Sequence, residues 1–371
     1  MSIPFFGLKD QYAALKDGLR AAIDGVLEHG RFLNGPEVTG LEEALAAYVG
    51  VKHAVACSSG TDALLMPLMA YGIGPGDAVF TTPFTFIATA EVIAFLGATP
   101  VFADIDPATF NLDPARLEAA VARVARQGRL RPRGIIPVDL FGLAAEYDAI
   151  RTIADKYGLF VLEDAAQAFG GVYHGRQVGS LGHVAATSFY PTKPLSAYGD
   201  GGAVLTDDDA LVDTLRSIRQ HGQGAHSYEN VRIGLTGRLD TLQAAVLLVK
   251  LAAFPGELEE RQRVARRYTA GLSGRYVTPA VPSGLKSAWA QYSILSLHRD
   301  ADILRLQKAG IPTNIYYPIP LHLQRAFAGL GHQAGDFPVS EKMAAEIFSL
   351  PMHPYLPNDQ IDRIVGVLIS D

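Results

Sequence analysis

The segment VAATSFYPTKPLSAYGDGGAV, residues 184–204, predicts two buried strands joined by a glycine-rich loop. Its apolar runs do not alternate with polar residues, which is typical of strands covered on both faces. Lys193 lies just past the first run, and three glycines follow it within nine residues. If its amine is held inside the protein, desolvation lowers its pKa and makes it a nucleophile toward carbonyl groups. Taken alone, the position fits an exposed loop lysine better.

Five further apolar runs precede this segment, and the gaps between them can hold helices, for example at 62–72, 88–96, 114–127 and 145–157. The runs are HAVACSS (53–59), AVFTTP (78–83), TPVFADI (99–105), GIIPVDLF (134–141) and LFVLEDA (159–165). Together the seven strands predict an α/β fold, a mostly parallel sheet with helices on both faces. Two amphipathic helices, at 11–29 and 37–49, come before the sheet.

The apolar helix expected at 241–254 belongs to the core or to a subunit interface. Pro255 and Gly256 follow it and mark the expected boundary between a large domain, residues 1–255, and a smaller α+β domain, residues 256–371. The smaller part is expected to contain a charged helix, a strand within 288–297 and two more helices.

Composition narrows the classes of function. The net charge of −6 over 371 residues disfavours a general nucleic-acid binder. A single cysteine, Cys57, excludes an internal disulfide or a cysteine-based metal cluster, and no metal site is expected. The first twenty residues lack a signal-peptide pattern, and the apolar stretch around Lys250 is too short to span a bilayer. We therefore expect a cytoplasmic protein without a membrane segment.

Ligands of open α/β sheets bind beyond the carboxyl ends of the strands. After the first strand comes Ser58-Ser59-Gly60-Thr61-Asp62, which opens a helix. A glycine and the unpaired N–H groups of a helix N-terminus suit a phosphate. The alternative is ordinary capping of that helix by Thr61 or Asp62.

Other strand ends carry further polar and aromatic residues. Asp164 ends the run LFVLED, and Gln167 follows three residues later. A buried carboxylate needs a positive partner, although a helix cap would also explain it. Ser188 can offer a hydroxyl to a phosphate, and Phe86, after another strand, can stack on an aromatic ring.

In combination, a phosphate loop, a strand-end acid and a strand-end lysine on successive βα units are what pyridoxal phosphate (PLP) requires. The anion is held by the loop, the pyridine nitrogen by the acid, and the aldehyde carbon by the lysine. Neither a dinucleotide-binding GxGxxG nor a GxxxxGK[ST] motif is present.

These residues lie in motifs that resemble the DegT/DnrJ/EryC1/StrS family of sugar aminotransferases, including SSGTDAL, EDAAQAFG, SFYPTKPLSAYGDGG and GRLDTLQAAVL. The resemblance covers essentially the whole chain. It implies the type I, aspartate-aminotransferase fold, PLP as cofactor, and a homodimer in which each active site is completed by the neighbouring subunit. It also implies that Lys193 binds the cofactor covalently. The implied noncovalent cofactor contacts are Asp164 with the ring nitrogen, Gln167 with the 3-oxygen, Gly60, Thr61 and Ser188 with the phosphate, and Phe86 with the ring face.

Within the family the chain looks most like enzymes that aminate C3 of a UDP-linked 3-keto-N-acetylhexuronate for O-antigen and lipopolysaccharide biosynthesis. That likeness implies L-glutamate as donor, 2-oxoglutarate as product, and a substrate site lined by Arg238, Tyr316 and Tyr317. An ion pair with Asp240 or another acid is the alternative for Arg238. Thr236 stands where the family usually has an asparagine that reaches the partner's phosphate site. A histidine is more usual in place of Tyr316, which weakens the transfer of the exact substrate.

Other readings remain at this point. The sugar could be a dTDP-linked 3-keto or 4-keto-6-deoxy sugar. A sugar dehydratase of the same fold usually has histidine in place of the lysine, which Lys193 argues against. A non-catalytic PLP-binding regulator is the alternative from a different class. His322 and His353 are expected in solvent-facing or capping roles.

Overall fold

The computed structural model describes residues 3–226 and 228–370. Its centre is a seven-stranded sheet in the order β1-β9-β8-β5-β4-β2-β3. The strands are β1 (His53–Cys57), β2 (Asp77–Thr81), β3 (Thr99–Phe102), β4 (Arg131–Ile135), β5 (Phe160–Asp164), β8 (Val184–Ser188) and β9 (Gly202–Thr206). Of these, β9 is antiparallel to both of its neighbours, and the other neighbouring pairs are parallel. The predicted mostly parallel α/β sheet is confirmed.

Strand β4 begins earlier than the predicted run at 134–141. It starts at Arg131, and both Arg131 and Arg133 form ion pairs with Asp77 of β2, at 2.9 and 3.7 Å. The apolar run continues beyond β4 without a regular ladder, because Pro137 has no N–H to donate. Arg131 and Arg133 therefore lie within the sheet, where β4 pairs with β2.

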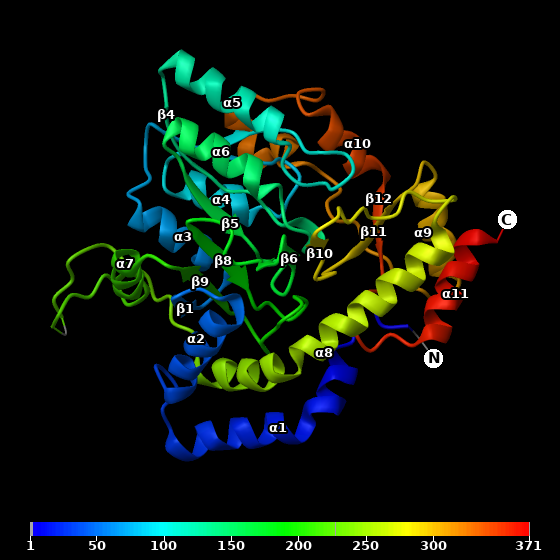
Figure 1. Cartoon of the computed structure of the whole chain (residues 1–371), viewed down its shortest axis with the longest axis horizontal. Coiled ribbons are helices and arrows are strands. Elements are labelled where there is room, and N and C mark those ends of the chain that lie inside the picture. Colours follow the sequence, from blue (N-terminus) through cyan, green and yellow to red (C-terminus); the bar gives the residue numbers. More distant parts are fainter. Residues whose placement is uncertain (1–2, 227, 371) are drawn as a thin grey trace.

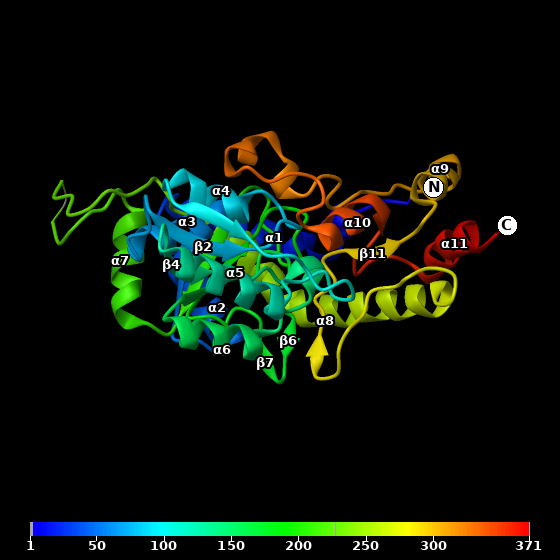
Figure 2. The ribbon, with the colours of Figure 1, turned by 90° about the horizontal axis from the view of Figure 1, so that it is seen from above.

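Helices cover both faces of the sheet (Figures 1 and 2). They are α2 (Pro36–Val49), α3 (Gly60–Ala70), α4 (Ala88–Phe95), α5 (Pro114–Gln127), α6 (Tyr147–Tyr157), α7 (Asp209–Arg219) and the first half of α8 (Thr241–Leu272). Helix α1 (Leu8–His29) packs against α8. In β2, Ala78 and Phe80 pack with α5 and α6, whereas Val79 packs with α3, α4 and α7. Burial on both faces explains why the strand sequences are continuously apolar.

One long helix, α8 (Thr241–Leu272), crosses the expected boundary without a break (Figure 1). The helix end expected at Pro255 is therefore wrong. Proline removes one backbone hydrogen bond, but α8 packs against α1, α2 and α11 (Asn358–Ile369), which hold it on both sides of Pro255. By length and composition α8 is the one helix of the described chain that could cross a membrane, yet half of its most apolar window is buried in the protein.

The C-terminal part has its own core. Its strands β11 (Tyr292–Leu295) and β12 (Ile347–Leu350) pair antiparallel, and its helices lie at the right of Figure 1. Smaller elements are α9 (Arg299–Lys308), α10 (Pro338–Glu346), β10 (Leu285–Lys286), β6 (Val172–Tyr173), β7 (Arg176–Gln177), and the 3-10 turns η1 (Leu140–Gly142), η2 (Leu321–Leu323) and η3 (Arg325–Leu330). This separate core supports a division at 255/256, which we keep as a proposal.

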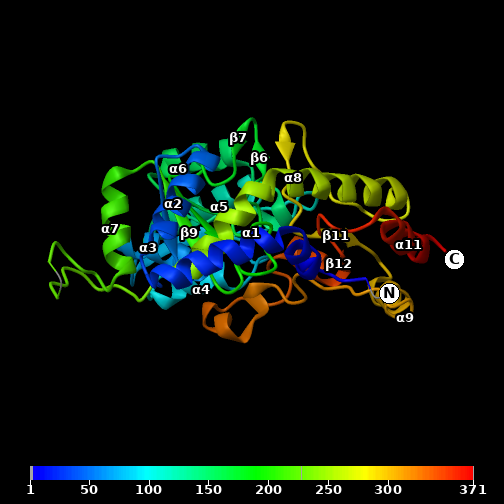
Figure 3. The same cartoon turned by 90° about the horizontal axis from the view of Figure 1, so that it is seen from below.

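An arm formed by residues 220–226 and 228–236 projects from the molecule beyond α7 (Figures 1 and 3). Isolated bridges join Gln220 to Thr236 and Gln223 to Asn230. At its outer part Tyr228 is 99% exposed and Ile233 is 85% exposed.

Candidate active site

A cavity of about 730 Å³ opens at the carboxyl ends of β5 and β8, in the size range of small-molecule sites. Nine of the residues singled out from the sequence line it: Gly60, Thr61, Phe86, Asp164, Gln167, Ser188, Lys193, Tyr316 and Tyr317. They come from five separate segments of the chain, so the fold brings them together.

Asp164 presents a buried carboxylate to this cavity. It ends β5 and is 4% exposed. The Thr89 hydroxyl donates to its Oδ2 at 2.8 Å, and the N–H of Ala166 donates to Oδ1 at 3.2 Å. Burial raises the pKa of Asp164, while these bonds and the charge of Lys193 oppose the rise. A cation placed against this carboxylate would lower its pKa further.

Lys193 lies in the loop after β8. Its backbone N–H donates to the backbone carbonyl oxygen of Tyr190 at 2.9 Å. Burial lowers the pKa of its amine to about 8, and the Asp164 carboxylate acts in the opposite direction. A lysine with this pKa is partly neutral near pH 7, and the neutral amine is the nucleophile. The alternative of an exposed loop lysine does not hold.

Gln167 and Tyr317 form one hydrogen-bonded unit. Gln167 Oε1 accepts from the N–H of Phe141 at 2.8 Å, and Nε2 donates to the Tyr317 hydroxyl at 2.9 Å. One Nε2 hydrogen is left for a ligand. Burial raises the pKa of Tyr317, so its hydroxyl stays neutral.

The N-terminus of α3 forms an anion-binding corner. Ser59 caps the helix, its Oγ accepting from the N–H of Asp62 at 3.0 Å, so the expectation of capping by Thr61 or Asp62 is wrong. A Cβ on Gly60 would lie 2.6 Å from Ser188 Cβ, so only glycine allows the helix to approach β8 this closely. Gly60, Thr61 and Ser188 therefore surround a helix N-terminus that suits a phosphate.

Thr236 and Arg238 do not line this cavity. The Thr236 hydroxyl hydrogen-bonds His221 Nε2 at 2.8 Å within the arm. Arg238 is half-buried, and within the described chain it forms no ion pair with Asp240. Its buried Nε has no hydrogen-bond partner among the described residues, so its guanidinium has capacity for a ligand.

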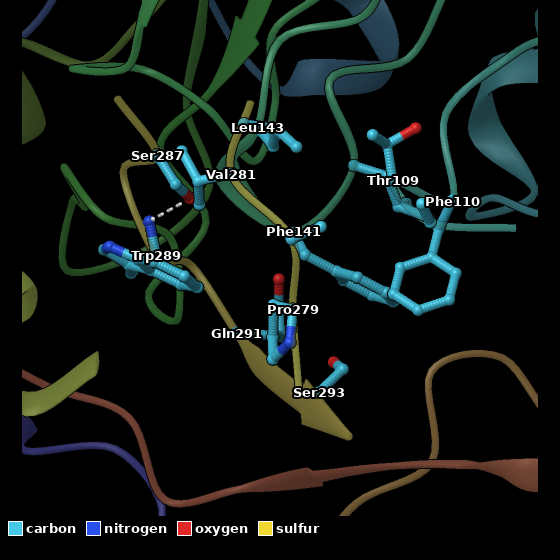
Figure 4. A pocket seen from close by; sticks show the side chains of 13 residues that line it. Thr109, Phe110, Phe141, Leu143, Pro279, Val281, Ser287, Trp289, Gln291 and Ser293 are labelled. Atoms are coloured by element: carbon cyan, nitrogen blue, oxygen red, sulfur yellow. Dashed lines mark hydrogen bonds between the residues drawn. The ribbon is translucent and has the colours of Figure 1, made fainter. Parts of the chain in front are cut away.

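Some lining residues were not singled out from the sequence. Thr85 and Thr89 are linked by a 3.1 Å hydrogen bond behind Asp164. Gln291 separates the cavity from a smaller hollow near Phe141 and Trp289 (Figure 4). Gln291 Oε1 is buried without a donor among the described residues. No motif marks Gln291, which lies inside a strand-like run of the smaller domain.

The histidines also differ from expectation. His322 and His353 are each 2% exposed, so a solvent-facing role is wrong for both. His322 Nε2 pairs with Glu341 at 3.0 Å. Within residues 3–226 and 228–370, no group of three or more His, Cys, Asp or Glu side chains is arranged to hold a metal ion.

The side chains of the cavity fit PLP. The helix N-terminus at Gly60 suits its phosphate, and the buried carboxylate of Asp164 lacks only a cation such as a protonated ring nitrogen. Lys193 faces the same space with an amine that is partly neutral near pH 7. Anion corner, acid and amine are thus all present in one cavity.

The sequence pattern of the DegT/DnrJ/EryC1/StrS aminotransferase family matches residues 14–369 of the chain. The chain is 48% identical over 369 residues to UDP-2-acetamido-2-deoxy-3-oxo-D-glucuronate aminotransferase of Pseudomonas aeruginosa, with 99% of this chain and 100% of that protein covered.

Two solved structures are similar to the chain over nearly its whole length. A DegT DnrJ EryC1 StrS aminotransferase from Brucella abortus is 54% identical with a TM-score of 0.97, covering 99% of this chain and 98% of that one. NtdA from Bacillus subtilis, solved with bound cofactor PMP, is 28% identical with a TM-score of 0.87, covering 96% and 81%. PMP is the aminated form of PLP.

Proposed function

The chain belongs to the DegT/DnrJ/EryC1/StrS aminotransferase family, and from this premise we propose that it transfers the amino group of L-glutamate to C3 of a UDP-linked 3-keto-N-acetylhexuronate. It is a PLP-dependent nucleotide-sugar aminotransferase with the fold of its family. The observation that carries the proposal is that Lys193, Asp164 and the anion corner at Gly60 line one cavity.

The residues of the cavity take complementary roles toward the cofactor. Gly60, Thr61 and Ser188 would hold the phosphate and Phe86 would stack on the ring. Asp164 would accept a hydrogen bond from the protonated ring nitrogen, and Gln167 would donate one to the 3-oxygen. The bound cofactor withdraws electrons from the carbon that carries the transferred nitrogen. Thr89 keeps Asp164 aligned through the 2.8 Å bond to its Oδ2.

Lys193 performs the proton transfers. Its pKa of about 8 lets it take a proton as a neutral amine and return it as an ammonium group near neutral pH. In the first half-reaction it would take a proton from the α-carbon of glutamate and return it to the cofactor carbon that receives the nitrogen. In the second it would take a proton from that carbon and deliver it to C3 of the sugar. Within each half-reaction, the Asp164 carboxylate would stabilise the ammonium form between uptake of the proton and its delivery.

Arg238 binds the sugar carboxylate and Thr236 reaches the cofactor phosphate, in both cases across a dimer interface. Neither side chain lines the cavity of its own chain, and Thr236 lies at the base of the projecting arm. Arginine suits a carboxylate because its guanidinium can donate two parallel hydrogen bonds. Tyr316 and Tyr317 line the substrate side of the cavity from the smaller domain.

The proposal also covers the oligomeric state, the cellular location and the use of the product. The enzyme is a homodimer with shared active sites, it acts in the cytoplasm without a membrane segment, and its amino-sugar product serves cell-surface polysaccharides such as O-antigen and lipopolysaccharide. The exposed Tyr228 and Ile233 of the arm support an interface between subunits. A purely regulatory protein would not need an amine and an acid that tune each other's pKa.

The half-reaction with glutamate tests the amino transfer directly. Purified protein loaded with PLP should be yellow, should bleach when L-glutamate is added, and should release one 2-oxoglutarate per site. Lys193→Ala is the control, because it should neither bleach nor release product. A yellow protein that stays yellow and yields no 2-oxoglutarate contradicts the proposal.

A panel of UDP- and dTDP-linked amino sugars, assayed in reverse with 2-oxoglutarate, tests the sugar. The UDP-3-amino-N-acetylhexuronate should react fastest. Faster reaction of a dTDP-linked 3-amino or 4-amino-6-deoxy sugar would move the assignment to that substrate.

A further inference from the structure

A second, much smaller cavity of about 20 Å³ lies behind the catalytic lysine. Thr192 and Lys193 line both this cavity and the active-site cavity, so the two spaces share a wall. The other lining residues come from α1, α8, the loop after Lys193 and the segment 353–355: Phe6, Gly7, Leu8, Gln11, Pro191, Pro194, Ser196, Arg261, His353, Pro354 and Tyr355.

Four buried polar atoms around this cavity lack a hydrogen-bond partner among the described residues. They are Gln11 Oε1, Arg261 Nε, and Nδ1 and Nε2 of His353. Other atoms of the first two side chains are well used: Gln11 Nε2 donates to the Glu257 carboxylate at 2.9 Å, and Arg261 donates to the Trp289 carbonyl oxygen at 2.9 Å. One of the two His353 nitrogens interacts with the backbone of Pro4. Buried polar atoms are nearly always hydrogen-bonded, so the other three atoms around one cavity point to a missing partner.

The charges around the cavity favour a neutral partner. The Arg261 cation has the Glu257 carboxylate nearby, and Glu257 also accepts from the Tyr355 hydroxyl at 2.7 Å. Burial, together with the charge of Arg261, lowers the pKa of His353 to about 4, so this histidine is neutral. Lys250, the other cation here, donates to Ser196 at 3.2 Å and lies over the Tyr198 ring. An added ion would meet no uncompensated charge of opposite sign.

The size of the cavity also fits water. A cavity needs about 10–15 Å³ to hold one water molecule, and an internal water usually makes about three hydrogen bonds. About 20 Å³ is enough for one water, and the three side chains supply donors and acceptors of both kinds.

We propose that this cavity holds one internal water molecule, bound by Gln11, Arg261 and His353, which gives Lys193 a hydrogen-bond partner on the side away from the cofactor. Arg261 Nε–H donates to the water, and the water donates to Gln11 Oε1 and to the unprotonated nitrogen of His353. One lone pair then remains for an N–H of Lys193. His353 is thus a positioning residue that acts on the lysine through the water. The water does not depend on the proposed reaction, whereas its effect on Lys193 rests on it.

A high-resolution crystal structure of the PLP-loaded protein tests the water itself. One ordered peak within hydrogen-bond distance of Arg261 Nε and a His353 nitrogen is expected. A dry cavity, or one filled by a shifted side chain, overturns the proposal. Because this observation needs no substrate, it can succeed or fail independently of the amino-transfer experiments.

Variants of His353 test the effect on Lys193. His353→Phe should remove the water and, by leaving the Lys193 ammonium without this partner, lower the pH midpoint for capture of PLP by the full-length apoprotein by about 0.5–1 unit, the size of one lost hydrogen bond. His353→Gln should retain the water and restore the midpoint. His322→Phe is the matched control, since His322 is equally buried but lies outside this cavity. An unchanged midpoint in His353→Phe, or in Gln11→Leu if the first variant does not fold, overturns the positioning role.

Discussion

Asp164 and Lys193 follow neighbouring parallel strands and face one cavity, and each stabilises the charge of the other. Burial raises the pKa of Asp164 and lowers that of Lys193, while the electrostatic attraction between the two groups acts against both shifts. The pairing of β5 with β8 sets this relationship, with Asp164 opposite Ala186 in the ladder.

Lys193→Ala should retain the phosphate corner and Asp164 but lose the amine. Reduction of the PLP-loaded wild type with borohydride should fix the cofactor to the chain as a mass increase, which should be absent in the variant. Turnover should fall by about 10²–10⁴-fold or more, the contribution of a positioned acid–base group.

Lys250→Ala is the control, because Lys250 is also a buried lysine whose pKa burial lowers to about 8, outside the active-site cavity. It should keep the mass increase on reduction. Labelling that survives in Lys193→Ala and disappears in Lys250→Ala would reassign the attachment site.

The rate of PLP capture by the apoprotein should depend on pH. Only the neutral amine attacks the aldehyde, and burial places the pKa of Lys193 at about 8. Below this value the ammonium form predominates, so the rate should rise with pH and level off above about 8 to 9. Stopped-flow absorbance across pH 6–10 measures the midpoint. A midpoint near 10.5, the ordinary value for lysine, would mean that the amine is not desolvated.

Much of the fold can be predicted from the sequence because the sheet is buried on both faces. Continuous apolar runs such as VAATSF then carry the signal, and the helices between them are amphipathic. The β4 start and the path of α8 could not be predicted in this way. The first depends on ion pairs between Arg131, Arg133 and Asp77, and the second on packing that holds a helix through Pro255.

The site residues predicted from the strand ends meet in one cavity because parallel strands share one carboxyl edge. The sequence does not show which of several similar polar side chains caps a helix or contacts a site residue. Ser59, and not Thr61 or Asp62, caps α3. Thr89 lies in the first turn of α4 and donates to Asp164 at the end of β5. The two residues are 75 positions apart in the chain, so the local sequence pattern does not predict this contact.

Thr89→Val should weaken the hold on the Asp164 carboxylate. The Thr89 hydroxyl lowers the pKa of Asp164, so its loss raises that pKa, and the acid limb of the kcat/KM profile should move to higher pH. A hydrogen bond to a charged group contributes about 1.5–3 kcal/mol, which sets the upper limit of the effect at roughly 10–150-fold. The pH profile of kcat/KM measures both quantities.

Two further variants distinguish loss of the Thr89 hydroxyl from a general packing defect. Thr89→Ser keeps a hydroxyl and should behave like the wild type. Thr85→Val should show a smaller effect, since Thr85 contacts Thr89 at 3.1 Å but is not bonded to Asp164. Equal losses in Thr85→Val and Thr89→Val would indicate a general packing defect.

Mixing two inactive variants should restore activity if Arg238 acts across the dimer interface. Lys193→Ala lacks the amine, and Arg238→Leu lacks the guanidinium, whose Nε has no partner among the described residues of its own chain. Random exchange of subunits makes about half of the dimers mixed, and each mixed dimer then has one site with both groups intact, so roughly a quarter of wild-type activity should return. If Arg238 served the site of its own chain, every site in a mixed dimer would lack one group and no activity would return. Thr236→Ala mixed with Lys193→Ala should follow the same pattern in cofactor affinity, whereas Tyr317→Phe, whose hydroxyl accepts from Gln167 in the same chain, should show no complementation.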